Sequence, residues 1–192
     1  MTYPKRIFFT GAPGSRWSGV AQCIETLSVF NITDRSKDRT YSHNQYSGHK
    51  GAYFGEGMEF PALLNEASLD YPYKTWEGIK LHKSHEWALQ LEDIKEQFPS
   101  SWTMLVYRPD MACYSWWHQA GGFEIQYPNY GSIENSINML HYIQTINNAM
   151  LDYSVQHNLT WHPFTEEWCE DVFKTKVEVS IPNRDILVSI HS

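Results

Sequence analysis

The feature that most constrains the fold of this chain is a glycine-containing turn near its start, placed between a strand pattern and a helix pattern. Residues 6–10 form a short apolar run that is typical of a buried strand. Gly11-Ala-Pro-Gly14 interrupts this run, and apolar residues at helical spacing follow over residues 17–30. A buried strand, a tight turn and an amphipathic helix in this order indicate the first half of a βαβ unit.

Strand and helix patterns continue to alternate along the chain. We predict further strands at residues 78–83, 102–107 and 160–164, and helices at residues 86–98, from Pro109 to Gly121, at residues 132–157 and after a capping Thr165. Residues 31–59 are predicted to be mostly loop, and residues 177–190 have strand-like stretches around Pro182. The alternation predicts an α/β fold with a mostly parallel central sheet flanked by helices, as a single domain over residues 1–192. In such folds the ligand lies outside the carboxyl ends of the strands.

The composition excludes several classes of protein. Hydrophobic residues make up 42% and charged residues 19%, which is typical of a globular domain. The formal charge of −7 argues against a general nucleic-acid binder, because such proteins use positive charge to displace counterions. Cys23, Cys113 and Cys169 form no Cys-x-x-Cys pair, so neither a disulfide framework nor a cysteine zinc site is indicated. With no signal peptide and no bilayer-length apolar run, we expect a cytoplasmic protein without a membrane partner.

The turn at residues 11–18 has the features of a phosphate-binding loop. Its glycines let backbone amides point inward, and the following helix N-terminus adds partial positive charge. The segment is close to the Walker form, but Arg16 stands at the second glycine position and Trp17 at the lysine position. ATP-dependent kinase or hydrolase chemistry needs that lysine, so the turn favours phosphate binding over such chemistry. The alternative is a tight turn that binds nothing.

A second anion-binding pattern follows the predicted strand at residues 102–107. Arg108 emerges at the end of the strand and Ser115 lies two helical turns further on, which suits a phosphate clamp. With Trp116, Trp117 and His118, this segment resembles sulfotransferases that use 3′-phosphoadenosine 5′-phosphosulfate (PAPS). The resemblance implies a P-loop-like fold in which Arg108 and Ser115 bind the 3′-phosphate. The spacing is one residue shorter than the usual family pattern.

The segment before this strand resembles the same family. A Lys-x-His pattern occurs as Lys80-Leu81-His82 and again as Lys83-Ser84-His85, and the distance to Arg108 favours the second. The resemblance implies that His85 is the general base and that Lys83 stabilises charge on the leaving phosphate, with His82 as the alternative base. A histidine is suited to this role because its pKa lies near neutrality. The resemblance covers residues 5–120 and, more loosely, residues 159–173.

The chain also departs from the family. The family's loop carries a lysine that contacts the phosphosulfate, and Gly14 stands at that position here. The resemblance implies a 5′-phosphosulfate site formed by Gly14, Ser15, Arg16, Trp17 and Ser18, with the hypothesis that Arg16 replaces the missing charge. The family's Arg-Lys-Gly signature near the C-terminus is absent, and Arg184 or Lys174 are the basic residues that could contribute instead.

These features together lead to one functional expectation with two alternatives. We expect a PAPS-dependent sulfotransferase whose small-molecule or glycan acceptor enters between residues 41–59 and 121–130, with no nucleic-acid partner. No metal is expected, since His82 and His85 would point to opposite faces of a strand and no third ligand lies nearby. The alternatives are a nucleotide or small-molecule kinase and a relative that binds nucleotide without catalysis.

Overall fold

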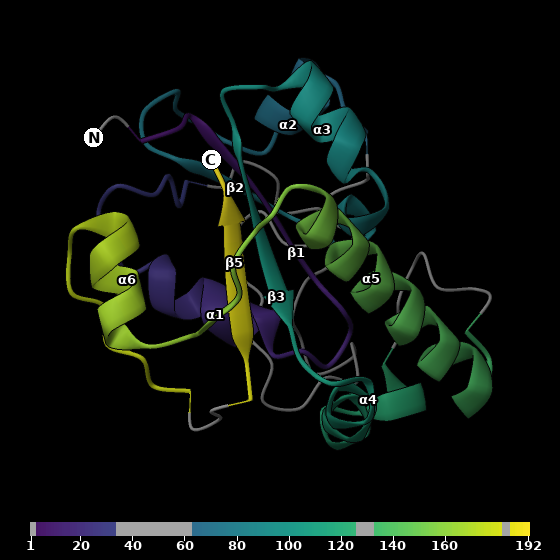
Figure 1. The fold of residues 1–192 in the computed structure, drawn as a ribbon. Coiled ribbons are helices and arrows are strands. Elements are labelled where there is room, and N and C mark those ends of the chain that lie inside the picture. Colours follow the sequence, from purple (N-terminus) through teal and green to yellow (C-terminus); the bar gives the residue numbers. More distant parts are fainter. Residues whose placement is uncertain (1–2, 34–62, 126–132, 182–184) are drawn as a thin grey trace.

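The computed structural model of the 192-residue chain describes residues 3–33, 63–125, 133–181 and 185–192 (Figure 1). In chain order the elements are β1 (Arg6–Gly11), α1 (Trp17–Ile24), α2 (Glu66–Asp70), β2 (Lys80–Lys83), the 3₁₀ helix η1 (His85–Leu89), α3 (Leu91–Gln97), β3 (Trp102–Tyr107), α4 (Asp110–Gln119), the 3₁₀ helix η2 (Gly122–Glu124), α5 (Ser136–Gln156), β4 (His162–Pro163), α6 (Glu166–Phe173) and β5 (Leu187–His191). This alternation confirms the predicted α/β class.

The central sheet is mixed, with strand order β2-β1-β3-β5-β4. Its core is parallel, because β1 pairs in parallel with both β2 and β3, as predicted. By contrast, β5 runs antiparallel to its neighbours β3 and β4. After α6 the chain passes the start of α1, where Ile181 lies against Gly19. The chain therefore enters the sheet at the edge where β1 and β3 end. A strand that begins at this edge runs in the direction opposite to β3, so β5 pairs with β3 in antiparallel fashion.

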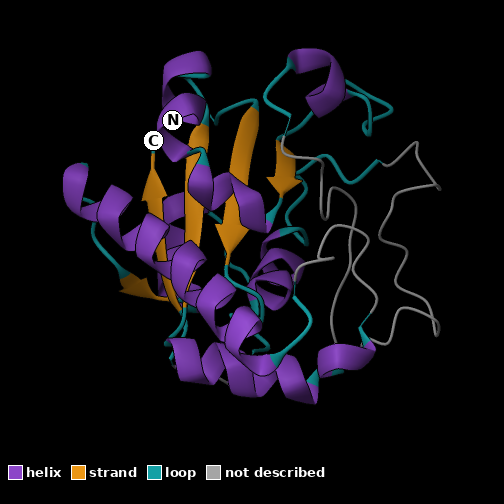
Figure 2. Ribbon diagram, turned by 90° about the vertical axis from the view of Figure 1, so that its right-hand side faces the viewer, coloured by secondary structure: helices purple, strands orange, loops and turns teal. Residues whose placement is uncertain are grey.

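Helices cover both faces of the sheet (Figures 1 and 2). The alternation of side chains along a strand sends Met104 and Val106 of β3 to the cluster that contains α1 and α6, and Leu105 to the cluster that contains α4 and α5. On β1, Phe8 joins a third cluster with Trp87 of η1 and apolar residues of α2 and α3. The sheet is thus a rigid platform whose strand ends are held in fixed positions.

Most element boundaries differ from the predictions by a few residues. The predicted helix over residues 17–30 ends at Ile24, although Leu27 and Phe30 still pack in the core through a turn. The predicted helix over residues 86–98 is divided at Gln90 into η1 and α3. The short helix α2, capped by the Asn65 side chain, lies in a stretch for which no helix was predicted.

Candidate functional site

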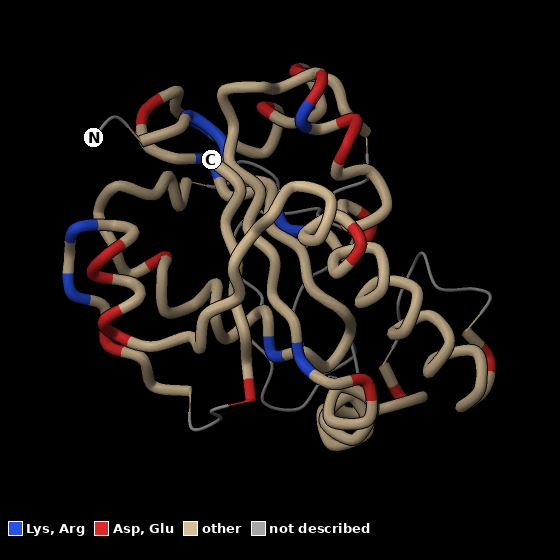
Figure 3. The backbone as a smooth tube through the Cα atoms, viewed as in Figure 1, with Lys and Arg blue, Asp and Glu red and all other residues tan. Residues whose placement is uncertain are grey.

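The predicted site residues follow the carboxyl ends of three neighbouring strands. β1 ends at Gly11, β2 at Lys83 and β3 at Tyr107, and the next residues form the turn before α1, the start of η1 and Arg108. Because these strands are parallel, their carboxyl ends share one edge of the sheet. Figure 3 shows basic positions at this edge and an acidic position just before β5.

The turn between β1 and α1 is tight and partly left-handed. The Ser15 amide donates to the Ala12 carbonyl at 3.0 Å, Gly14 has φ +79°, and Arg16 has φ 64°. A left-handed conformation at a non-glycine residue such as Arg16 is uncommon. α1 begins at the next residue, so its first backbone N–H groups face the turn. This is the local geometry in which helix N-termini bind anions.

Gly14 packs directly on the backbone of α4. A Cβ atom at this position would lie 1.9 Å from the carbonyl oxygen of Cys113, and the φ of Gly14 is one that L side chains rarely adopt. No lysine fits at residue 14 in this arrangement. Glycine at this position therefore has a physical reason, namely the close approach of the turn to α4.

Arg108 connects the turn, α4 and the residue before β5. Its Nε donates to Asp185 Oδ2 at 3.0 Å, and one terminal nitrogen donates to the carbonyls of Ala112 at 3.2 Å and Gly14 at 3.5 Å. Arg108 is only 8% exposed, so these partners, rather than water, stabilise the charge of its guanidinium group. Asn147 of α5 in turn donates to the Arg108 carbonyl at 3.0 Å. The structure thus brings Arg108 and Gly14 into contact, two residues that the family resemblance assigns to different ends of the nucleotide.

Arg16 lies over an aromatic ring of α4. Its guanidinium carbon is 4.1 Å from the centroid of the Trp116 ring, a cation–π distance. Burial and the nearby charge of Arg108 lower the pKa of Arg16, while the carboxylate of Asp185 opposes that change. The charges of Arg16, Arg108 and Asp185 are therefore close enough to influence one another.

Ser115 and Ser18 differ in how they lie relative to the turn. Ser115 is exposed on α4. It comes one residue before Trp116, whose ring contacts Arg16, so the Ser115 side chain points about 100° around the helix axis from that of Trp116. Trp116 was not among the predicted site residues, and the shortened spacing after Arg108 was the signal that could have indicated it. Ser18 is half-buried in the first turn of α1.

His85 lies directly beneath the turn. Its Nδ1 contacts the carbonyl oxygen of Gly11, and Thr10 Oγ1 donates to the His85 carbonyl at 3.1 Å. A carbonyl oxygen can only accept, so Nδ1 carries the proton and Nε2 the lone pair in the neutral ring. His85 is 2% exposed, with the Trp17 ring at a centroid distance of 4.3 Å. His82, the alternative base, instead packs against Phe8 and Tyr73 in the third core cluster.

Lys83, Trp17 and Ser15 are buried. Lys83 Nζ forms an ion pair with Glu25 Oε1 at 2.6 Å, and the two side chains are 0% and 6% exposed. The ring of Trp17, at the Walker lysine position, stacks on Phe9 in the core. Among the described residues, Ser15 Oγ has no hydrogen-bond partner. In this arrangement Arg16 and Arg108 bring positive charge to the turn, whereas Lys83 is buried in its ion pair with Glu25.

Other predicted residues lie apart from this site or outside the described residues. His118 packs against Tyr114, Trp117 and Phe123 on α4 and η2. Lys174 is exposed at the end of α6. Residues 41–59, residues 126–130 and Arg184 are outside the described part of the chain. Within the described part, no cluster of His, Cys, Asp and Glu side chains could hold a metal ion, and no helix is long and apolar enough to cross a membrane.

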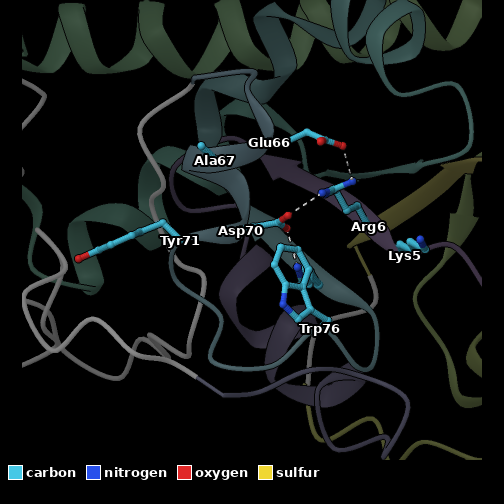
Figure 4. A pocket seen from close by; sticks show the side chains of 8 residues that line it. Lys5, Arg6, Glu66, Ala67, Asp70, Tyr71 and Trp76 are labelled. Carbon is cyan, nitrogen blue, oxygen red and sulfur yellow. Dashed lines mark hydrogen bonds and ion pairs between the residues drawn. The ribbon is translucent and has the colours of Figure 1, made fainter.

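A separate pocket of about 660 Å³ opens at the opposite edge of the sheet, where β1 and β2 begin (Figure 4). Asp70 of α2 accepts from Arg6 at 2.9 Å and from Lys80 at 2.5 Å, and Trp76 lies beside them, 79% exposed. The pocket is lined by Lys5, Arg6, Glu66, Ala67, Asp70, Tyr71, Trp76 and Lys80. None of the predicted site residues lines it, so it is distinct from the candidate site at the carboxyl edge.

Comparison of the chain with models of protein families, with curated proteins and with solved structures finds no match.

Proposed function

We propose that this chain binds PAPS at the turn between β1 and α1 and transfers its sulfuryl group to a hydroxyl or amine of a small-molecule or glycan acceptor in the cytoplasm. The observation that carries the proposal is the approach of two arginines to one turn. Arg16 comes from the turn itself and Arg108 from the end of β3, and both lie beside the N-terminus of α1. Guanidinium groups and helix N-termini are the usual protein ligands of phosphate groups. We propose a P-loop-like arrangement of this sheet on the same grounds.

Each end of the nucleotide has its own group of residues in this proposal. The 5′-phosphosulfate lies against the N–H groups of the first turn of α1, with Ser15, Ser18 and Arg16 around it. The 3′-phosphate pairs with Arg108, and Ser115 lies on the helix that follows. Both subsites are cationic, which suits a ligand with several negative charges.

His85 is the general base of the proposed reaction. Its Nε2 takes the proton of the acceptor hydroxyl, the oxygen forms a bond to sulfur, and the bond from sulfur to the bridging phosphate oxygen breaks. The products are the sulfated acceptor and 3′-phosphoadenosine 5′-phosphate. The contact of Nδ1 with Gly11 supports this role because it leaves the lone pair on Nε2. Since His85 is 2% exposed, the side chains that cover it have to move before an acceptor can reach it.

A second candidate function is nucleotide binding without transfer. Two observations favour it: Gly14 leaves no room for the lysine of the sulfotransferase loop, and Lys83 is held by Glu25 in a buried ion pair. Both reduce the positive charge available to the leaving phosphate. The kinase alternative is disfavoured because Trp17, at the Walker lysine position, is a core side chain.

Thermal unfolding with 3′-phosphoadenosine 5′-phosphate or with ATP and magnesium separates these functions. A ligand at 100 times its Kd stabilises the folded state by about 2.7 kcal/mol, and we expect this from the bisphosphate alone. Arg16→Gln should weaken binding by about tenfold, whereas Lys174→Gln, at the exposed end of α6, should leave it unchanged. Stabilisation by ATP alone would favour the kinase, and stabilisation by neither would contradict nucleotide binding.

Transfer is then tested by the release of 3′-phosphoadenosine 5′-phosphate from PAPS in the presence of pooled acceptors. Loss of release in His85→Gln with unchanged bisphosphate affinity supports its role as the base. Binding without release from the wild-type protein favours the second candidate.

A further inference from the structure

Asp185 lies where the two arginines of the candidate site approach each other. The residue precedes β5, and its Oδ2 accepts from Arg108 Nε at 3.0 Å. Its carboxylate is also close enough to Arg16 to interact with it electrostatically. The anion site at the carboxyl edge therefore contains an anion that the chain itself supplies.

The balance of charge explains why such an anion is present. Arg108 is 8% exposed, and a buried cation without a counterion is costly. The carbonyls of Gly14 and Ala112, which also accept from its guanidinium, carry no net charge. Asp185 neutralises one arginine, while the pair Arg16 and Arg108 carries two positive charges. The two phosphate groups of the proposed nucleotide match that charge better than one carboxylate does.

The position of Asp185 allows its side chain to leave. Its pairing strand begins only at Leu187, opposite Tyr107 of β3. The side chain of Asp185 is 40% exposed, so rotation about its own bonds carries the carboxylate into solvent. The backbone nearby stays in place through the hydrogen bond from the Phe164 amide to the Ile186 carbonyl, at 3.1 Å.

We propose that the Asp185 carboxylate occupies the 3′-phosphate position beside Arg108 in the ligand-free protein and is displaced when the phosphate groups of the ligand pair with Arg108 and Arg16. This inference deepens the proposed function and rests on it for the identity of the nucleotide. The carboxylate acts as an internal competitor, because it competes with external anions for the arginines. It keeps Arg108 in an ion pair when no ligand is bound, and it prevents weakly binding anions from occupying the site. A ligand with two phosphate groups overcomes the competition.

Asp185 could instead position Arg108 so that it binds the ligand. If Asp185 competes with the ligand, removing its charge strengthens phosphate binding, and if it positions Arg108, removing its charge weakens phosphate binding. We compare Asp185→Asn and Asp185→Ala with Asp171→Asn, which removes the same charge from an exposed position on α6. Binding of 3′-phosphoadenosine 5′-phosphate and of inorganic phosphate is measured by calorimetry on the full chain. Thermal melts without ligand confirm that each variant is folded.

We expect both Asp185 variants to bind the bisphosphate and inorganic phosphate about tenfold more tightly, and Asp171→Asn to stay within about twofold of the wild type. Equal or weaker binding by folded Asp185 variants overturns the inference, while binding of the bisphosphate by the wild type leaves the proposed function standing. Tighter binding of inorganic phosphate alone supports the internal competitor and overturns the nucleotide proposal. Failure of every protein to bind either probe overturns both.

Discussion

At the scale of the single residue, Gly14 determines how closely the turn approaches α4. A Cβ atom at residue 14 would overlap the Cys113 carbonyl. The carbonyl oxygen of Gly14 accepts a hydrogen bond from Arg108. The contact aligns the turn with Arg108 without any side chain at residue 14. The absence of a side chain at residue 14 is thus linked to this packing, and Arg16 and Arg108 bring positive charge to the turn.

Gly14→Ala tests this packing. We expect the substitution to lower the free energy of unfolding by about 2–4 kcal/mol, because it combines an unfavourable φ with a backbone overlap at 1.9 Å. Gly19→Ala is the matched control, since Gly19 lies inside α1 and a Cβ there would meet the flexible Ile181 side chain at 3.2 Å. Its stability should change by less than about 1 kcal/mol. Urea unfolding measures both, and equal effects at the two positions would contradict this account of the turn.

At the scale of the elements, the pair of Lys83 and Glu25 joins the end of β2 to the end of α1. Removing one partner takes a 2.6 Å ion pair away from the buried charge of the other, so Lys83→Met should cost about 3–5 kcal/mol in urea unfolding. The double variant Lys83→Met/Glu25→Met should recover most of that loss, because the apolar side chains fill the same space. If Lys83 is structural, the double variant keeps its affinity for 3′-phosphoadenosine 5′-phosphate. A single variant as stable as the wild type would show that the pair does not hold these elements together.

The elements also show what the sequence could predict. Apolar runs predicted β1 and β3 closely, and the rule that ligands lie at the carboxyl ends of parallel strands predicted that the turn, His85 and Arg108 would share one edge. The direction of β5 was not predictable, because it depends on the path of the chain after α6. The same holds for the partners Glu25 and Asp185, which lie 58 and 77 residues away from Lys83 and Arg108 in the sequence. No local pattern encodes such contacts.

At the scale of the whole molecule, a cluster of ionisable side chains links the end of β5 to α5 and α3. His191 of β5 contacts the Tyr153 hydroxyl through Nδ1 at 2.6 Å, and its ring lies 4.8 Å from that of His157. His157 in turn pairs with Glu92 of α3 at 2.8 Å. Burial, and then the nearby positive charge of Lys95 and His157, lower the pKa of His191, with Glu92 opposing the change. The cluster joins α3, α5 and β5.

This arrangement predicts that stability falls as the solution becomes mildly acidic. The unfolded chain protonates His191 near its ordinary pKa of about 6.5, whereas the folded protein protonates it only at lower pH. Between these two values the unfolded state binds more protons, so the contribution of His191 is complete above about pH 6.5 and is lost as the pH falls toward the folded-state pKa. The pH dependence of the unfolding free energy, measured from pH 7.5 to pH 5, should be shallower for His191→Gln. His162→Gln, an exposed histidine on β4, is the control and should keep the wild-type slope. An unchanged slope in His191→Gln would show that protonation elsewhere governs the acid sensitivity of the fold.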